Sequence, residues 1–569
     1  MVLVSGGTNT PALSFAAILF SGWLLVVLLL HASTVNAMKT IKLKTVFDLY
    51  LFIIRNPFFM SRCFAFLFFF LVAAAQSRSQ VLPKEGSALN YRLIGFSFST
   101  GQQAGRYRIE IAVGHHISDD SFKKNIVIRT PFSKDTKIIN EVPFFGKQYT
   151  WKVISEGAQP ASSDFHHFST SSVREVDTSI VRMRVLQKAK KFKDAYVFLD
   201  GTRTLYDMNG LPVWYLPDIE GVSIEKSQLR DLKVTQQGTI TFLFEEHGAY
   251  EVNYNGQVLW KAPNDGRVNG QDNEYYHHEF TRLDNGHYMA LGSEFMLWNQ
   301  STPPAADSNF LLRHTNKKQR DSAGLQYTCA PYGTLIEYND KGDVVWSWKS
   351  SEYFKRSDIY YHKSKGRPDA TVHANSFYFD EKEGVIYVGF RNISRIVKVK
   401  YPEGTVLASY GEIYTAGAPE AGNGLFCRQH SVRKSDDGYL YLFNNNVCVQ
   451  TALLPQILKL KEPASGHDLK KIWEYNCVAD DIGPDQQGML RFPNGGNVTE
   501  LPDHSLFVNM STAYSKVFLL DEDKEVLWSA IPEKWNEHGK RWLMVYDYRA
   551  SIITSRKDLE KLIWNAETK

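Results

Sequence analysis

Short runs of alternating hydrophobic and polar residues, separated by turn residues, fill most of the chain beyond residue 88. Such runs predict half-buried β-strands, because successive side chains of a strand point to opposite faces. Between residues 88 and 175 the runs are Tyr91–Phe98, Tyr107–Val113, Asn125–Ile128, Gln148–Ile154 and Phe165–Ser169. Short strands with turns between them predict a small β-sandwich of the immunoglobulin-like or fibronectin-like kind over residues 88–175.

From residue 185 onward a longer unit recurs. In its first landmark a glycine precedes a tryptophan by four residues at the end of a strand, at 210–214, 256–260 and 342–346, with degenerate copies at 404–408, 468–473 and 524–528. Its second landmark is a tight hairpin turn followed by an apolar strand, marked by Gly238, Gly286, Gly384, Gly438 and His504.

About six such units, each carrying about four strands, are typical of a β-propeller. We therefore predict an all-β protein, in which a six-bladed β-propeller over residues 185–555 follows the sandwich. The last apolar segment, 546–554, is expected to complete the first blade and close the ring. A parallel solenoid is the structural alternative, but hairpin units with variable inserts favour radial closure.

Two apolar stretches open the chain, at residues 11–30 and 64–72. The second follows a methionine and an arginine and ends in three alanines, which is the order of a secretory signal peptide. We interpret 60–80 as that signal and 1–59 as an upstream extension from a wrongly chosen start. The competing interpretation is a membrane anchor at 11–30, which is long enough to span a bilayer.

Both interpretations place the body outside the cytosol, secreted or periplasmic, with an N-terminal membrane tether in the second case. Export permits disulfides, and four cysteines allow three pairings between which the sequence does not choose: Cys329, Cys427, Cys448 and Cys477.

Composition excludes several classes of function. The 569 residues include 65 Lys and Arg against 61 Asp and Glu, a net charge of +4, so no electrostatic footprint for nucleic acid is visible. A hydrophobic content of 43% and a charged content of 22% indicate a folded globular protein. The sequence has no GxxxxGK[ST] loop, no GxGxxG after a strand and no GxSxG, which disfavours a nucleotide-dependent transferase and a serine hydrolase.

Candidate chemistry lies at one repeat position. The innermost strand of each propeller blade lines the central channel, so equivalent positions should converge there. Stepping back eight residues from the hairpin residue gives Arg230, His278, His430 and Gly496. The fourth blade has a longer hairpin and offers His373 at this level, with Arg391 on the strand that follows.

Three histidines at one level could bind a divalent metal. The fixed positive charge of Arg391, and of Arg230 if it lies near, opposes the binding of a cation. Glu279 is the only carboxylate directly beside the histidines. Its side chain should point to the opposite face of the strand from His278, because successive residues of a strand alternate. The same residues suit an oxyanion, because guanidinium forks match sulfate or phosphate and imidazoles donate further hydrogen bonds. The residues therefore predict a metal-free anion site, in which a histidine can act as nucleophile or acid–base.

At these residues the sequence resembles the bacterial arylsulfate sulfotransferases, which transfer a sulfuryl group without a nucleotide donor. The resemblance covers about 185–555 and rests on segments 277–291, 370–392 and 428–445, with 332–348 and 546–553 similar to the family's blade-ending and ring-closing segments. The sandwich matches the family's N-terminal domain in placement more than in sequence.

The resemblance implies a ping-pong reaction with no cofactor, in which His430 attacks the sulfur of a phenolic sulfate ester and becomes sulfohistidine before a phenol accepts the group. His278, His373 and Arg391 would hold the sulfuryl oxygens, and Asn375 would orient the group. A homodimer is a further family expectation. From chemistry alone, His278 or His373 could protonate the leaving phenolate, and the second nitrogen of His430 needs an acceptor that the sequence does not identify.

One segment departs from the family. Bacterial members carry a threonine at the channel in the last blade, where this chain has Pro493–Asn497. We expect Asn497 to replace that contact and Arg230 to join it in binding substrate. Three other classes of function stay open. The first is a propeller with the same pocket but lyase or hydrolase chemistry on an exported polyanion, and the second is a non-catalytic module that binds sulfated glycan. The third and weakest is a metal-dependent enzyme, which would need a carboxylate or water-accessible ligand set.

Overall fold

The computed structural model describes the chain over residues 81–99, 105–157, 162–222, 227–299, 327–354, 361–364, 367–370, 372–411, 425–446, 454–464, 469–478, 494–511 and 515–566. These residues belong to one compact unit, Gln80–Lys569. The predicted extension (1–59) and signal peptide (60–80) lie outside the described residues. Within the ranges given above, no helix is long and apolar enough to cross a membrane.

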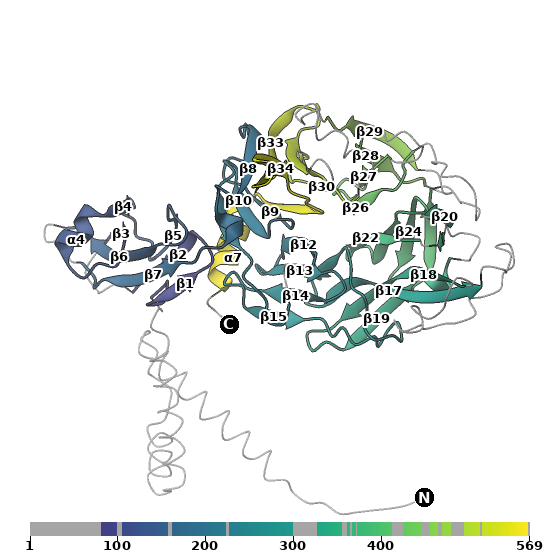
Figure 1. Cartoon of the computed structure of the whole chain (residues 1–569), viewed down its shortest axis with the longest axis horizontal. Coiled ribbons are helices and arrows are strands. Elements are labelled where there is room, and N and C mark those ends of the chain that lie inside the picture. Colours follow the sequence, from purple (N-terminus) through teal and green to yellow (C-terminus); the bar gives the residue numbers. More distant parts are fainter. Residues whose placement is uncertain are drawn as a thin grey trace, which may run out of the picture. The chain divides into compact units, whose positions relative to one another are not determined.

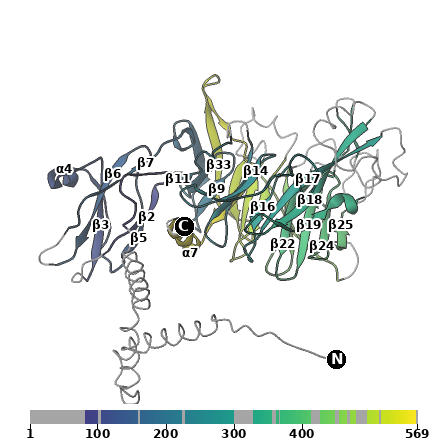
Figure 2. The same ribbon diagram turned by 90° about the horizontal axis from the view of Figure 1, so that it is seen from below.

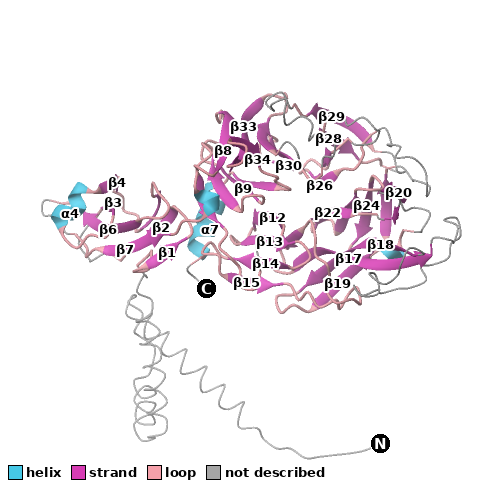
Figure 3. Ribbon diagram, in the orientation of Figure 1, coloured by secondary structure: helices cyan, strands magenta, loops and turns pink. Residues whose placement is uncertain are grey.

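The described residues form an all-β protein of many sheets, in which α-helix is confined to the short α4 and to α7 at the C-terminal end (Figure 3). The N-terminal residues build two sheets, one with strand order β1-β7-β6-β3-β4 and one that pairs β2 with β5. Their bounds are β1 Ser87–Leu89, β2 Leu93–Ser97, β3 Tyr107–Val113, α4 Asp119–Lys124, β4 Ile126–Arg129, β5 Lys137–Glu141, β6 Gln148–Ser155 and β7 His166–Thr170.

All five strands expected in this region are present, and the sequence pattern missed β1 and β5. The two sheets share a core, in which Phe96 of β2 packs edge-on against Trp151 of β6 at 5.1 Å between ring centroids. On the other side β2 contacts helix α7 (Arg556–Asn565), which lies next to it in Figure 2. Gly95 of β2 is required there, because a Cβ would lie 2.8 Å from Cγ2 of Ile563.

Six larger sheets follow within the described part of the chain (Figure 1). Sheet 1 contains β9 Tyr196–Leu199, β10 Thr204–Asp207, β11 Pro212–Tyr215 and β35 Ala550–Ile553. Sheet 2 contains β12 Leu229–Val234, β13 Ile240–Phe244, β14 Gly248–Val252 and β15 Val258–Lys261. Sheet 3 contains β16 Phe280–Arg282, β17 Tyr288–Asn299, β18 Tyr327–Tyr338 and β19 Val344–Lys349.

Sheet 4 contains β22 Ala374–Asp380, β23 Val385–Phe390, β24 Arg395–Lys400 and β25 Val406–Tyr410. Sheet 5 contains β26 His430–Lys434, β27 Leu440–Asn444, β28 Gln456–Lys461 and β29 Lys470–Asn476. Sheet 6 contains β30 Asn497–Glu500, β31 Leu506–Met510, β32 Lys516–Leu520, β33 Val526–Asn536, β34 Arg541–Met544 and β8 Val181–Gln187. A separate hairpin pairs β20 (Tyr361–Ser364) with β21 (Arg367–Ala370), and short 3-10 turns lie at Arg174–Val176 and Ser350–Glu352.

The six sheets contact one another in cyclic order. Contacts run from β35 to β12, β13 to β16, β17 to β22, β22 to β26 and β27 to β30, and β31 returns to β35. The C-terminal strand β35 pairs antiparallel with β9, which confirms the expected completion of the first sheet by the end of the chain. Figure 1 shows β12, β22, β26 and β30 on the inner side of their sheets.

The tryptophan landmark joins each of several sheets to the next one. The indole N–H of four landmark tryptophans donates to a backbone carbonyl of the neighbouring sheet: Trp214 to Tyr254 (2.7 Å), Trp346 to Pro402 (2.7 Å), Trp473 to Glu522 (3.3 Å) and Trp528 to Met208 (2.9 Å). A tryptophan combines a large apolar face with one donor that needs a partner when it is buried. The repeat seen in the sequence is therefore an inter-sheet contact.

Candidate functional site

Three of the predicted site residues meet around the ring of Tyr548, directly before β35. Its ring centroid lies 5.4 Å from that of His278 and 5.9 Å from that of His430, and the guanidinium carbon of Arg230 lies 4.3 Å above the ring. The rings of His278 and His373 are 5.1 Å apart and nearly perpendicular. Each of these five side chains lies on or next to a strand of a different sheet, so five sheets contribute to the site.

The backbone departs from regular strand geometry where these side chains arise. The strand register shifts at the start of three inner strands, between Arg230 and Lys233, between Ala374 and Ser376, and between His430 and Arg433. Positive φ angles occur at His278 (64°), His373 (53°) and Ser431 (53°). A bulge re-aims side chains, and a non-glycine residue with positive φ persists only where its surroundings hold it, at a cost of about 1–3 kcal/mol.

Both ring nitrogens of His430 have partners. Nδ1 lies 2.5 Å from Oδ1 of Asn445, and the N–H of Gly495 points at Nε2 from 3.2 Å. Because Nδ2 of Asn445 donates to the carbonyl of Gly495 at 3.0 Å, the amide oxygen is the atom that faces the imidazole. Nδ1 of His430 therefore carries the proton, and Nε2 holds the lone pair. Asn445 is the acceptor that sequence analysis left unidentified.

Asn445 follows the apolar strand β27 and is fully buried. A weak sequence signal existed, because three asparagines, 444–446, stand directly after an apolar run in a segment already matched to the family. Gly495 lies in the Pro493–Asn497 segment that departs from the family. Its φ is +76°, and a Cβ there would lie 2.7 Å from the ring of Tyr548, so only glycine brings its N–H against His430.

The histidines of the site are held neutral. Burial first, and then the positive charge of Arg391, keep the pKa of His430 well below 6.5 and lower the pKa of His373 to about 3. Burial, followed by the neighbouring His277, keeps the pKa of His278 well below 6.5. Burial also lowers the pKa of His277 to about 4. At neutral pH all four imidazoles offer one donor and one acceptor nitrogen each.

Arg391 lies directly after β23 and ties the histidine segments together. Nη2 donates to Oδ1 of Asn494 at 2.6 Å, Nη1 donates to Oδ1 of Asn392 at 2.9 Å, and its backbone N–H donates to the carbonyl of His373 at 2.9 Å. The guanidinium thus contacts the segment whose next residue, Gly495, contacts His430, and its charge lowers the pKa of His373.

Two other predicted residues are bound to the protein's own backbone. Nδ2 of Asn375 donates to the carbonyl of Gln429 at 2.8 Å, which links β22 to β26. Nδ2 of Asn497 donates to the carbonyl of Ala550 at 2.8 Å, and its Oδ1 accepts from the N–H of Ala550 at 3.0 Å. Both amides are buried, so each joins neighbouring sheets.

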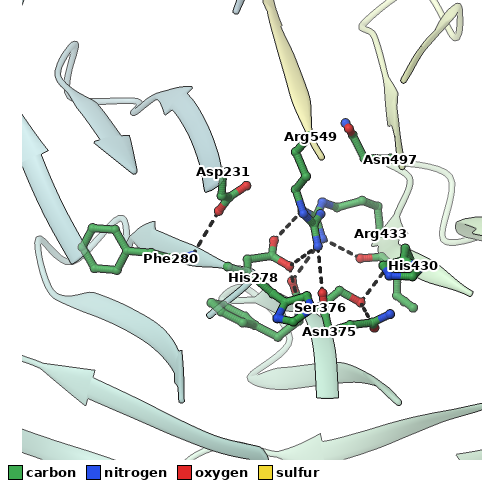
Figure 4. Close-up of polar contacts among 12 residues, drawn as sticks. Asp231, His278, Phe280, Asn375, Ser376, His430, Arg433, Asn497 and Arg549 are labelled. Atoms are coloured by element: carbon green, nitrogen blue, oxygen red, sulfur yellow. Dashed lines mark hydrogen bonds and ion pairs between the residues drawn. The ribbon is translucent and has the colours of Figure 1, made fainter. Parts of the chain in front are cut away.

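A buried ion network accompanies the histidines (Figure 4). Glu279 pairs with Arg433 and with Arg549, the latter at 3.4 Å, and accepts from the N–H of Phe377 at 3.0 Å. Burial raises the pKa of Glu279, but the two arginines outweigh it and hold this pKa below its ordinary value. Nη2 of Arg549 also donates to the carbonyl of Asn375 at 2.9 Å. Glu279 is therefore the shared carboxylate that pairs with both arginines.

A cavity of about 140 Å³ opens beside the histidines. Its wall includes three histidines, three aromatic residues and two glutamates: His277, His278, His373, Tyr275, Phe295, Tyr332, Glu245 and Glu246. Glu245 is paired with Arg230 at 3.3 Å, so that this arginine is already engaged. A cavity of roughly 150 Å³ is large enough for a benzene ring.

No metal site is evident in the described ranges, since they contain no group of three or more His, Cys, Asp or Glu that could hold an ion. Of the four cysteines among which disulfides were possible, Cys427 is disulfide-bonded, whereas Cys477 is buried with a free thiol and takes part in none. Cys448 and the side chain of Cys329 lie outside the described residues.

Comparison with known proteins gives one family. Residues 183–302 and 301–456 match the family described as Arylsulfotransferase (ASST). No curated protein matches the chain. Similar solved structures include a Bacteroides caccae protein of unknown function (14% identity, 63% of this chain and 98% of that one, TM-score 0.34) and BamB from Moraxella catarrhalis (9% identity, 79% and 98%, TM-score 0.24).

Proposed function

We propose, from the premise that residues 183–456 belong to the arylsulfotransferase family, that this protein is an aryl sulfotransferase working by two successive transfers through His430. A phenolic sulfate ester is the donor and a phenol is the acceptor, and no nucleotide or other cofactor takes part. We further propose that sheets 1–6 are the blades of a six-bladed β-propeller, which their cyclic contacts support, and that the N-terminal sheets form a β-sandwich.

The tautomer of His430 is the single observation that carries this proposal. With its proton on Nδ1, bound to Asn445, the ring presents the lone pair of Nε2. In the first transfer Nε2 attacks sulfur, the bond from sulfur to the aryl oxygen breaks and the phenolate leaves. In the second transfer the acceptor oxygen attacks sulfur, the N–S bond breaks, and the phenol's proton passes to a base.

Arg391 and His373 stabilise the transition state of sulfuryl transfer and form no covalent bond to the sulfuryl group. Sulfuryl transfer, by analogy with phosphoryl transfer, has a loose transition state, so positioning and electrostatics provide most of the catalysis. The guanidinium of Arg391 stands on the side of the site where His373 and the Gly495 segment meet, which suits the oxygens of the transferring group.

Gly495 takes the place of the family's threonine in this proposal. Asn497, which we expected there, is engaged by Ala550, whereas the Gly495 N–H reaches the site itself. That N–H occupies the lone pair of Nε2 in the free protein and must withdraw when sulfur arrives. The contact also favours an alternative function, an anion-binding propeller without turnover, because it satisfies the nitrogen that would attack.

We also propose that residues 60–80 are a signal peptide and that the body, from about residue 80, functions outside the cytosol. Support comes from the order of a basic residue, an apolar run and three small residues, which is that of a signal peptide. Association into a homodimer stays a prediction.

Protein beginning at Gln80 tests the function. It is incubated with p-nitrophenyl sulfate, with and without phenol, in EDTA and without nucleotide, while nitrophenolate release and intact mass are followed. We expect phenol-dependent release and a sulfuryl adduct that maps to His430 and is absent from His430→Ala. The exposed His504 provides the matched control, and His504→Ala should behave like the parent. Sulfated-ligand binding with neither release nor adduct would favour the non-catalytic alternative.

A further inference from the structure

Two consecutive histidines contact each other through like nitrogens beside the cavity. Nδ1 of His277 and Nδ1 of His278 are 2.7 Å apart, and the two rings are nearly perpendicular. A hydrogen bond between them requires that one nitrogen carries the proton and the other the lone pair. Which one donates decides which nitrogen of His278 is free to react.

The surroundings of His277 determine the direction of this bond. Its Nε2 lies 3.1 Å from the carbonyl oxygen of Gly292 and 2.8 Å from Oγ of Ser293. A carbonyl oxygen can only accept a hydrogen bond, so Nε2 of His277 must carry the ring proton. If Nε2 were unprotonated, its lone pair would face a lone pair of the Gly292 carbonyl oxygen. Since burial lowers the pKa of His277 to about 4, the ring is neutral at pH 7 and has no second proton. Its Nδ1 is therefore the acceptor.

His278 must then donate from Nδ1. The carboxyl group of Glu245, 3.9 Å from the same nitrogen, also favours a proton there. Nε2 of His278 is left with the lone pair, and no hydrogen bond within the described part of the chain engages it. His278 lines the cavity, whose volume of about 140 Å³ is close to that needed for a benzene ring, so a phenol bound there would lie beside His278.

We propose that His277 is a positioning residue, which holds His278 in the tautomer whose Nε2 removes the proton of the acceptor phenol. The proposal rests on the proposed sulfotransfer and concerns its second transfer. There the O–S bond forms, the N–S bond to His430 breaks, and the proton moves from the phenol oxygen to Nε2 of His278 before it is lost to solvent. His278 thereby gains a role different from holding sulfuryl oxygens.

A series of acceptor phenols separates this role from a structural one. General base catalysis matters most for weakly acidic phenols and little for phenols already ionised at the assay pH. In His277→Leu we expect transfer to 4-methoxyphenol to fall on the order of 10²-fold, while transfer to pentafluorophenol stays near the parent rate. Formation of the His430 adduct from p-nitrophenyl sulfate should fall much less than transfer to 4-methoxyphenol, because nitrophenolate leaves without a proton.

His277→Asn is the matched rescue, because its carboxamide oxygen can accept from His278 near the position of the lost Nδ1. It should recover much of the rate with 4-methoxyphenol. A uniform fall across all phenols, or no fall with any, would overturn the role of His277. Melting temperatures of both variants show whether the fold is retained.

A direct readout keeps the inference testable if sulfotransfer itself fails. ¹⁵N spectra of histidine-labelled protein distinguish the two neutral tautomers of each ring. We expect His278 with its proton on Nδ1, and loss of that state in His277→Leu. A proton on Nε2 of His278 in the parent would refute the inference, whereas an absent His430 adduct with the expected tautomer would count only against the proposed function.

Discussion

Oδ1 of Asn445 lies 2.5 Å from Nδ1 of His430, across a single hairpin from the end of β27 to the start of β26. The same amide donates to the carbonyl of Gly495, so it cannot turn its nitrogen toward the ring without losing that bond. One buried asparagine thus sets both the orientation of the imidazole and the nitrogen that holds the lone pair.

Asn445→Ala should slow formation of the sulfuryl adduct by about 10²-fold, since the imidazole loses the acceptor that fixes its tautomer. The rate is measured by rapid quench and intact mass after mixing with p-nitrophenyl sulfate. Asn446→Gly is the control, because Asn446 is the next residue, has positive φ and carries a more exposed side chain. Equal rates in the two variants would remove Asn445 from the mechanism.

Arg391→Lys should lower the rate of adduct formation by at least about 10-fold while the melting temperature changes little. An ammonium group keeps the charge but cannot donate in a fixed fork to Asn392, Asn494 and a sulfuryl oxygen together. Steady-state rates and a thermal melt of the same preparation provide the comparison. A parental rate would show that Arg391 acts only in holding the two asparagines.

Glu279→Gln should lower the free energy of unfolding by about 3–5 kcal/mol, because it leaves the buried Arg549 and the half-buried Arg433 without the carboxylate that pairs with them. Urea unfolding followed by tryptophan fluorescence measures the loss. Glu560→Gln breaks an exposed pair with Arg556 and should cost less than about 1 kcal/mol. Similar losses in the two variants would contradict the importance of the buried network.

The neutral, buried His430 predicts a loss of stability in acid. Its pKa in the fold is lower than the ordinary 6.5, so below pH 6.5 the unfolded chain binds the proton more readily and unfolding is favoured. His430→Gln should therefore flatten the decline in unfolding free energy below pH 6.5, by up to about 1.4 kcal/mol per pH unit.

Urea titrations at pH 7, 6 and 5 measure this slope in the parent and in His430→Gln. Exposed His504 is the control, because hydrogen bonding to Glu500 raises its pKa and gives the opposite sign. An unchanged slope in His430→Gln would mean that His430 is protonated in the fold.

Local patterns in the sequence carried much of the architecture. Alternating runs located the strands, hairpin turns located their connections, and the segment at 546–554 was correctly expected to complete the first sheet. The repeat also placed His278 and His430 at equivalent positions, and both rings indeed contact Tyr548. Periodicity and turn chemistry act between residues close in sequence, so a single chain displays them directly.

Partners of buried polar groups were decided only by the tertiary structure. The pairing of Asn497 with Ala550, of Glu279 with Arg549 and of Gly495 with His430 joins segments that lie far apart in the chain. Bulges and positive φ angles at the inner strands turn these side chains in directions that strand alternation does not predict. The repeat in the sequence by itself brought His278 and His430 to equivalent positions; distances across neighbouring sheets, which no local pattern encodes, decided which other residues join them and which atom of each is free to react.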